Sequence, residues 1–80
     1  MITVHYINPY LENDKAFYDI NISEDGEFVA RLSSSTFSRN FEPQEAIDRA
    51  ITIVESMFPG KTADEVYIDY NGDTTFNWVR

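Results

Sequence analysis

Few side chains in this sequence have the types and spacing that acid–base or metal chemistry requires. His5 is the only histidine, and Asp19 and Asp69 each fall within an alternating, strand-like run. Two carboxylates on one face of a sheet can hold a magnesium ion or divide the acid and base steps of a reaction. No further residue completes such a site, so we expect both aspartates to be solvated surface groups and His5 to be non-catalytic.

Motifs for nucleophilic, phosphate or thiolate chemistry are missing from the sequence. The chain has no cysteine, which excludes a disulfide framework and a thiolate metal site. The serines cluster without the pattern of a nucleophile elbow, and three scattered glycines form no phosphate-binding loop. We therefore predict that the protein is not an enzyme and that it uses no cofactor and no metal.

The chain is strongly acidic, with 14 acidic and six basic residues and a formal net charge of -8. This charge repels nucleic acid and anionic membranes and attracts basic protein surfaces, although it can also serve solubility alone. The N-terminus does not resemble a signal peptide, and no apolar run reaches membrane-spanning length. We expect a cytoplasmic protein. Its partner would be a protein or ribonucleoprotein complex with a basic surface.

One helix is predicted in the second half of the chain. Pro43 suits a first helical position, and Pro59-Gly60 ends the helix. Its apolar stripe has helical spacing and is expected to fill the core; it consists of Ala46, Ile47, Ala50, Ile51, Val54, Met57 and Phe58. Phe37 and Phe41 are expected to anchor the segment that crosses to the helix from the preceding strand.

The first strand is predicted from the alternation of apolar and polar residues between Ile2 and Tyr6. Asn8-Pro9 is expected to end it, because both residues favour turns. The segment from Tyr10 to Lys15 is then predicted to be a polar loop.

Two hairpins are predicted on either side of the helix. In the first, a three-residue loop, Glu24-Asp25-Gly26, would place Ile22 opposite Phe28 and Ile20 opposite Ala30 on one face. In the second, a three-residue loop, Asn71-Gly72-Asp73, would align the large residues on both sides of it, which are Val66, Ile68, Tyr70, Thr74, Phe76 and Trp78.

Residues 1–80 are therefore predicted to form a single α+β domain with the order β-β-β-α-β-β. About five strands would form an antiparallel sheet, and the amphipathic helix would pack on one face. The opposite, open face would carry alternating residues of every strand. These are Thr3, His5, Ile7, Phe17, Asp19, Asn21, Val29, Arg31, Tyr67, Asp69, Thr75, Asn77 and Val79.

A partner-binding surface is predicted on this open face and on the acidic turns beside it, because it mixes aromatic and charged residues as partner surfaces do. The residues assigned to it are Glu12, Asp14, Phe17, Asp19, Glu24, Asp25, Arg31, Tyr67 and Asp69.

The segment from Phe17 to Met57 resembles the N-terminal domain of HicB-type antitoxins. The likeness lies in the order of a strand, an Asp25-Gly26 hairpin, a second strand, a polar crossing and a helix that opens with Glu45-Ala46. It implies an antitoxin that neutralises an RNase toxin.

In its size, acidity, absence of cysteine and α+β pattern, the whole chain is similar to small phage-encoded anti-CRISPR and anti-defence proteins. This resemblance implies a stoichiometric inhibitor that occupies a basic surface of a host nucleic-acid-handling complex without catalysis. It also implies a location in the bacterial host cell, if a phage encodes the protein. We take it as the leading hypothesis and HicB-like antitoxin function as an alternative. A further alternative is a structural or assembly protein that dimerises through its open face or an edge strand, since Phe17, Val29, Tyr67 and Val79 would permit such contacts.

Overall fold

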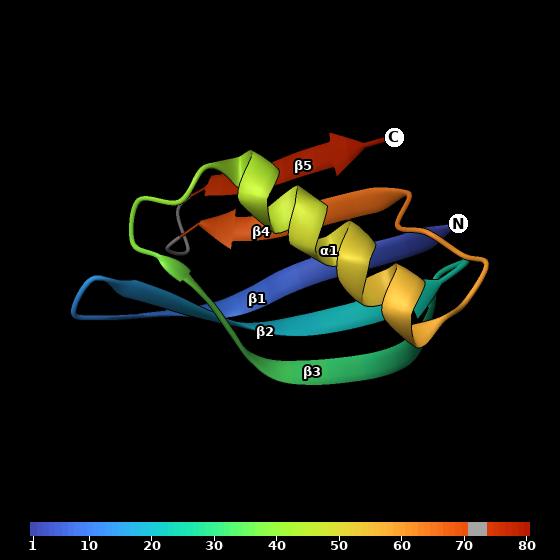
Figure 1. Ribbon diagram of the computed structural model, residues 1–80, viewed down its shortest axis with the longest axis horizontal. Coiled ribbons are helices and arrows are strands. Elements are labelled where there is room, and N and C mark those ends of the chain that lie inside the picture. The colour runs from blue at the N-terminus through green and yellow to red at the C-terminus, as the bar shows by residue number, and fades with distance from the viewer. Residues whose placement is uncertain (71–73) are drawn as a thin grey trace.

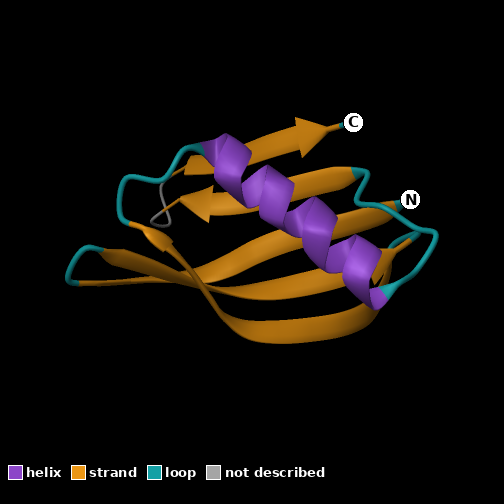
Figure 2. Cartoon of the chain, viewed as in Figure 1, coloured by secondary structure: helices purple, strands orange, loops and turns teal. Residues whose placement is uncertain are grey.

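The computed structural model describes residues 1–70 and 74–80, and it has the predicted α+β order of elements. One helix lies across one face of a five-stranded sheet whose strand order is β3-β2-β1-β4-β5 (Figures 1 and 2). The elements are β1 (Ile2–Glu12), β2 (Lys15–Glu24), β3 (Glu27–Ser38), α1 (Pro43–Met57), β4 (Glu65–Tyr70) and β5 (Thr74–Val79).

The sheet is not antiparallel throughout, because β1 and β4 pair in parallel from Thr3 opposite Glu65 to Tyr6 opposite Ile68. The cause is the path of the chain. β3 runs parallel to β1 after two hairpins, and α1 then crosses back over the sheet, so β4 starts at the end where β1 starts (Figure 1). The backbone N–H of Asp64 donates to the carbonyl of Ile2 at 2.8 Å, which ties the two strand starts together.

The helix begins as the sequence predicts, with Glu42 in the extended N-cap position and Pro43 in the first turn. Its fully buried residues are Ala46, Ile47, Ala50 and Val54, while Ile51 and Ile53 are half-buried. The prediction that Met57 fills the core is wrong, since this residue is 40% exposed. Met57 lies in the last turn, beyond the last buried helical residue.

An aromatic cluster fills the core between the helix and the sheet. The ring of Tyr6 meets those of Tyr18 and Phe37 edge-on at centroid distances of 5.8 and 5.5 Å, and Phe37 stacks on Phe41 at 4.6 Å. Phe37 and Phe41 therefore anchor the crossing segment, as predicted. The Tyr6 hydroxyl donates to the carbonyl of Ala46 at 2.8 Å, and burial raises the pKa of this phenol.

The β2–β3 hairpin has a shorter turn than predicted. Asp25 and Gly26, with φ angles of 52° and 85°, form a two-residue turn between the paired Glu24 and Glu27. Asp-Gly is a favoured sequence for such a turn, because its backbone twist matches that of the strands. The prediction of a three-residue loop is thus wrong.

A bulge compensates for this short turn. Ser23 pairs with Phe28, but Ile22 pairs with Ala30, so Val29 is an extra residue on β3. The insertion returns Ala30 to the core face and leaves Phe28 beside Ser23 on the open face, where it is 65% exposed. The predicted pairs of Ile22 with Phe28 and of Ile20 with Ala30 are therefore wrong.

β1 does not end at Asn8-Pro9, as the sequence suggested. These two residues form an irregularity at which Asn8 has a φ angle of 54°, and the strand continues to Glu12. Tyr10 pairs with Phe17, so the predicted polar loop is the far end of a hairpin with β2. Its turn is Asn13-Asp14.

The β4–β5 hairpin has the predicted register. Ile68 pairs with Phe76 and Val66 with Trp78, so the large residues of both strands share the face that the helix covers. Tyr70 pairs with Thr74, and the predicted loop residues between them, 71–73, lie outside the residues that the structure describes.

Candidate protein-binding surfaces

The open sheet face carries five of the nine predicted binding residues, Phe17, Asp19, Arg31, Tyr67 and Asp69, on strands β2, β3 and β4. The register places them as the alternation predicted, since their chain neighbours Ala16, Tyr18, Ile20, Val66 and Ile68 are buried under the helix. Val29, which was also predicted to lie on the open face, is instead the bulge residue of β3. Phe28 takes the open-face position beside Ser23.

Asp19 is held by two neighbouring strands. The Asn8 side-chain amide on β1 and the Arg31 guanidinium on β3 both donate to its Oδ2 atom, at 3.1 and 3.0 Å. The Asn8 hydrogen bond and then the Arg31 contact hold the pKa of this carboxyl below its usual value. Asp19 is therefore an anion within a short polar chain across three strands.

The other polar contacts of the open face join β1 to β4 or lie within β4. His5 Nε2 lies 3.1 Å from Asp69 Oδ1, and its ring lies 5.5 Å from that of Tyr67. Glu65 accepts hydrogen bonds from the hydroxyls of Thr3 at 3.2 Å and Tyr67 at 2.7 Å. The hydrogen bond to the Glu65 carboxylate raises the pKa of the Tyr67 phenol.

Asp19 and Asp69 do not share a site. Asp19 lies on β2 and Asp69 on β4, with β1 between them, so two strand spacings of about 4.8 Å each separate their backbones. Each carboxylate has its own partners, Arg31 and Asn8 for the first and His5 for the second. The arrangement provides two separate polar pairs.

Two features of the open face were not found from the sequence. Tyr10 packs beside Phe17, with ring centroids 6.1 Å apart, and is 59% exposed; the sequence placed it in a loop. Asn21 lies between His5 and Arg31 in register, and its Oδ1 atom is buried with no hydrogen-bond partner among the described residues.

The four acidic turn residues lie at opposite ends of the sheet, so the nine predicted residues do not form one patch. Glu24 pairs with Lys61 at 2.6 Å, and Asp25 pairs with the N-terminal ammonium of Met1 at 2.6 Å. The contact with this ammonium lowers the pKa of Asp25, and the Asp25 carboxylate raises that of the amino group. Both carboxylates are thus internally compensated.

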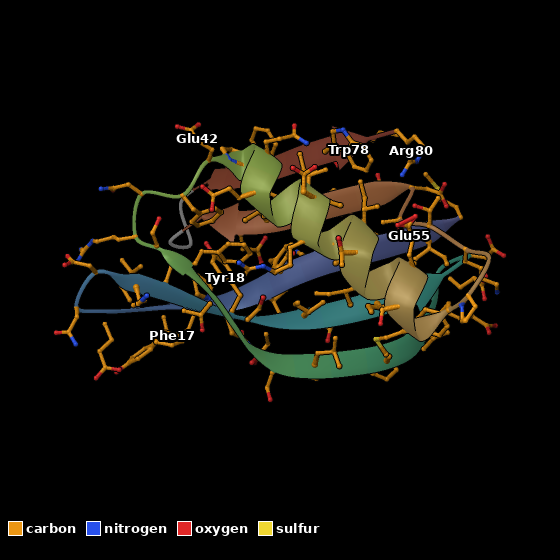
Figure 3. The ribbon with its side chains drawn as sticks, in the orientation of Figure 1. Phe17, Tyr18, Glu42, Glu55, Trp78 and Arg80 are labelled. Carbon is orange, nitrogen blue, oxygen red and sulfur yellow. The ribbon has the colours of Figure 1, made fainter. Side chains whose placement is uncertain are left out.

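Glu12 and Asp14 lie at the other end of the sheet, next to the β1–β2 turn, and both are exposed. Within residues 1–70 and 74–80, neither side chain forms an ion pair. Phe17 lies close to this end (Figure 3). This end therefore combines uncompensated acidic residues with the Tyr10–Phe17 aromatic pair.

The outer surface of α1 is also acidic, and its residues are not among the nine assigned to the predicted binding surface. We define the acidic helix surface as the exposed residues Glu42, Glu45, Asp48 and Glu55. The first and last of these lie at opposite ends of the helix (Figure 3). Their spacing is typical of any solvated helix face, so the sequence offered no signal to single them out.

The one cation on the helix does not neutralise this surface. The Arg49 guanidinium lies 3.9 Å from the centre of the Phe37 ring and donates to the carbonyl of Thr36. Among the acidic helix residues, Asp48 accepts a hydrogen bond from Gln44 at 2.9 Å, which carries no charge. Within the residues that the structure describes, none of these four exposed carboxylates forms an ion pair.

Other kinds of site were sought in the part of the chain that the structure describes. No group of three or more acidic or histidine side chains there is placed to hold a metal ion, and no pocket is present. None of its helices is long and apolar enough to cross a membrane.

Comparison with known proteins adds no relative. A scan against protein-family models gave no match, and neither did a search of the curated proteins or of the solved structures.

Proposed function

We propose that this protein is a non-enzymatic binding protein that docks its acidic helix surface onto a basic, nucleic-acid-binding surface of another protein or ribonucleoprotein. The observation that carries the proposal is the uneven neutralisation of the charge. Asp19, Glu24 and Asp25 each have a cationic partner within the chain, whereas Glu45 and Glu55 on the helix have none among the described residues. Glu12 and Asp14, at one end of the sheet, also form no ion pair there, and they therefore serve as the comparison in the test below.

The geometry of the helix suits this role. Glu45, Asp48 and Glu55 follow one another at helical spacing on one face. At 1.5 Å per residue, the distance along the axis from Glu45 to Glu55 is about 15 Å. A row of fixed negative charges of this length attracts the same basic surfaces that bind a phosphate backbone, and it accelerates association at low salt.

The proposal also specifies how the protein would inhibit its partner. A small acidic protein that competes with nucleic acid for a host complex would act stoichiometrically, in the manner of phage-encoded anti-CRISPR and anti-defence proteins. The polar and aromatic residues of the open face, including Phe17 and Tyr67, would then be a second contact surface on the opposite side of the sheet.

The test uses a variant that neutralises the helix without altering its fold. In Glu45→Gln/Asp48→Asn/Glu55→Gln, three exposed carboxylates become amides of the same shape. The control is Glu12→Gln/Asp14→Asn/Glu27→Gln, which removes the same charge from exposed residues at the ends of the sheet. Each tagged protein is incubated with bacterial lysate at low and moderate salt, and nucleic acid is then added to the captured complexes.

We expect the wild-type protein and the control to retain a nucleic-acid-binding complex at low salt and to release it to added nucleic acid. The helix variant should retain it at least about tenfold less well, because several charge pairs are lost. Equal capture by both variants would contradict a helix-based contact. Capture that persists in excess nucleic acid would contradict competition for its binding surface.

A further inference from the structure

The outer edge of β5 is unpaired. β5 is the last strand in the sheet order, and no strand in residues 1–70 or 74–80 lies beyond it (Figure 1). An unpaired edge presents a row of backbone N–H and C=O groups that can bind another strand. β5 therefore offers hydrogen bonds that the chain does not use itself.

The β4–β5 pairing determines which residues direct these groups outwards. The backbone N–H of Arg80 donates to the carbonyl of Asp64 at 2.9 Å, in the same register as the rest of the pair. Residues of an antiparallel pair alternate between bonding to the partner strand and pointing away from it. Thr75, Asn77 and Val79 consequently direct their N–H and C=O groups to the outer edge.

β5 has none of the usual features that prevent edge pairing. The segment Thr74–Val79 contains no charged residue and no proline. Its pairing with β4 is continuous and has no bulge. Two of its apolar residues, Phe76 and Val79, are 38% and 54% exposed. A straight, uncharged edge with exposed apolar side chains is suited to binding another strand of the same kind.

We propose that β5 pairs with β5 of a second copy of this chain, antiparallel about a two-fold axis through Asn77. In this register, Asn77 faces Asn77 of the second copy, and Thr75 faces Val79. Each of these pairs exchanges two backbone hydrogen bonds. In this register the three outward-facing residues of each copy all face one another, so every outward-facing N–H and C=O group of Thr75, Asn77 and Val79 is used.

The same register is favourable for the side chains on the helix-covered face. It places Phe76 opposite Trp78 of the second copy and Trp78 opposite Phe76. These are non-hydrogen-bonded positions, at which cross-strand side chains come closest and aromatic pairs stabilise a sheet. In the single chain, Phe76 is 38% exposed and Trp78 is half-buried against the core. Pairing would cover the exposed part of both rings.

The position of Arg80 leaves this edge accessible. Its guanidinium donates to the carbonyl of Ala63 at 3.0 Å and to the hydroxyl of Thr62 at 3.0 Å, on the β4 side of the strand. Arg80 directly follows β5 and lies beside Trp78, with its guanidinium 5.5 Å from the Trp78 ring (Figure 3). The cation is thus held away from the outer edge.

The dimer would be a continuous sheet with both helices on the same face, because the two-fold axis is perpendicular to the sheet. An edge contact of this size is small, so we expect a dissociation constant in the micromolar range, at roughly 10 to 100 µM. The association concerns the protein alone and does not depend on the proposed function. Its failure would leave the lysate experiment unaffected.

The first experiment is sedimentation equilibrium of the purified protein at physiological salt over a range of concentrations. Asn77→Lys places two like charges opposite each other at the two-fold axis, while its side chain remains on the open face. Val29→Lys is the matched control, since it adds the same charge at the bulge of the other sheet edge. Far-UV circular dichroism establishes that each variant is folded.

We expect the wild-type protein and Val29→Lys to move from monomer to dimer with rising concentration. Asn77→Lys should raise the dissociation constant at least about tenfold. A wild-type protein that stays monomeric up to about 500 µM, well above the expected dissociation constant, would overturn the proposal. Equal dimerisation of folded Asn77→Lys would overturn it as well.

The second experiment tests the register with single cysteines in a chain that has none. Across the two-fold axis, two Asn77→Cys residues lie within the Cα separation that a disulfide allows. Two Thr75→Cys residues would be about four residues apart along the strands and beyond that range. Under mild oxidation, Asn77→Cys should form a covalent dimer, and Thr75→Cys should not. Faster cross-linking of Thr75→Cys would exclude this register.

Discussion

The two edge strands of the sheet, β3 and β5, each have an unpaired row of backbone groups, but they differ in how well this row is protected from another strand. β3 is 12 residues long, carries Glu27 and Arg31, and breaks its pairing with β2 at two places. β5 is six residues long, uncharged and regular. Bulges and charges obstruct the approach of another strand, so β3 is protected and β5 is open.

The comparison shows that one irregularity can serve two purposes. The Val29 bulge corrects the register that the tight Asp25-Gly26 turn would otherwise impose, and it also bends the outer edge of β3. The β4–β5 pair needs no such correction, because its register already places Phe76 and Trp78 on the core side. Its edge therefore stays straight.

The largest expected loss of stability comes from a substitution in the core that joins both edge strands to the rest of the sheet. Ile22 on β2 is fully buried, and Ile22→Ala should lower the free energy of unfolding by about 2 to 5 kcal/mol. Phe28→Ala, on the exposed side of the same hairpin, should cost less than about 1 kcal/mol. Urea denaturation measures both values.

The same denaturation experiment shows whether the two edges unfold together. Trp78, the only tryptophan, reports on β5 through its fluorescence, and far-UV circular dichroism reports on α1. We expect coincident transitions, because one core joins all the strands. A fluorescence transition at a lower urea concentration than the circular dichroism transition would mean that β5 unfolds as a separate unit. The two edges would then not belong to one cooperative structure.

Removal of the β3 bulge should have a smaller effect on stability. It should, however, change the self-association of the protein. Deletion of Val29 leaves Phe28 and Ala30 on their present faces and makes the ladder regular from Glu27 to Leu32. The free energy of unfolding should change by about 1 kcal/mol or less. In an Asn77→Lys background, the deletion should create self-association through β3, measurable by sedimentation. Val29→Ala, which keeps the bulge, should stay monomeric there.

The smallest effect concerns the polar chain on the open face beside β3. The folded-state pKa of Asp19 lies below its ordinary value of 3.8, so its contribution to stability is present above that pH and is lost as the pH falls through the lower value. Asp19→Asn should therefore be less stable than the wild-type protein at pH 7, and the gap should close towards about pH 2. Arg31→Ala should reproduce the loss at pH 7. Thermal unfolding at both pH values measures it, and a gap that persists in acid would contradict this account.

Side-chain alternation predicted which residues of β2, β4 and β5 face the helix and which face solvent, but it placed Phe28 of β3 on the wrong face and did not predict how the strands connect. It gave the correct register for the β4–β5 pair, where both strands are regular. It gave the wrong loop for β2–β3, because a longer loop and a short loop followed by a bulge at Val29 produce nearly the same alternation. Asn8-Pro9 was taken as the end of a strand, whereas tertiary pairing carries β1 through it as an irregularity.

Strand order and direction have no signature in the period of a single strand, so the parallel β1–β4 pair was not predicted. Side-chain alternation also could not predict which side chains of the binding surface contact one another. The sequence placed Asp19, Arg31, Tyr67 and Asp69 on one face, but it could not show that Asp19 bonds to Arg31 while Asp69 bonds to His5 across another pair of strands. It also could not show that Arg49 turns towards Phe37 and leaves the outer helix acidic.

The parallel β1–β4 pair has a consequence for biosynthesis. β1 is the central strand and is made first, but its second neighbour is translated after β2, β3 and α1. A nascent chain that has formed the β1–β2–β3 meander still has an unpaired edge along Thr3–Tyr6, and no helix yet covers its apolar face. That edge is closed only by a contact between distant parts of the chain, which is a slow step in folding. The growing polypeptide is thus most vulnerable to aggregation before residues 65–70 emerge from the ribosome.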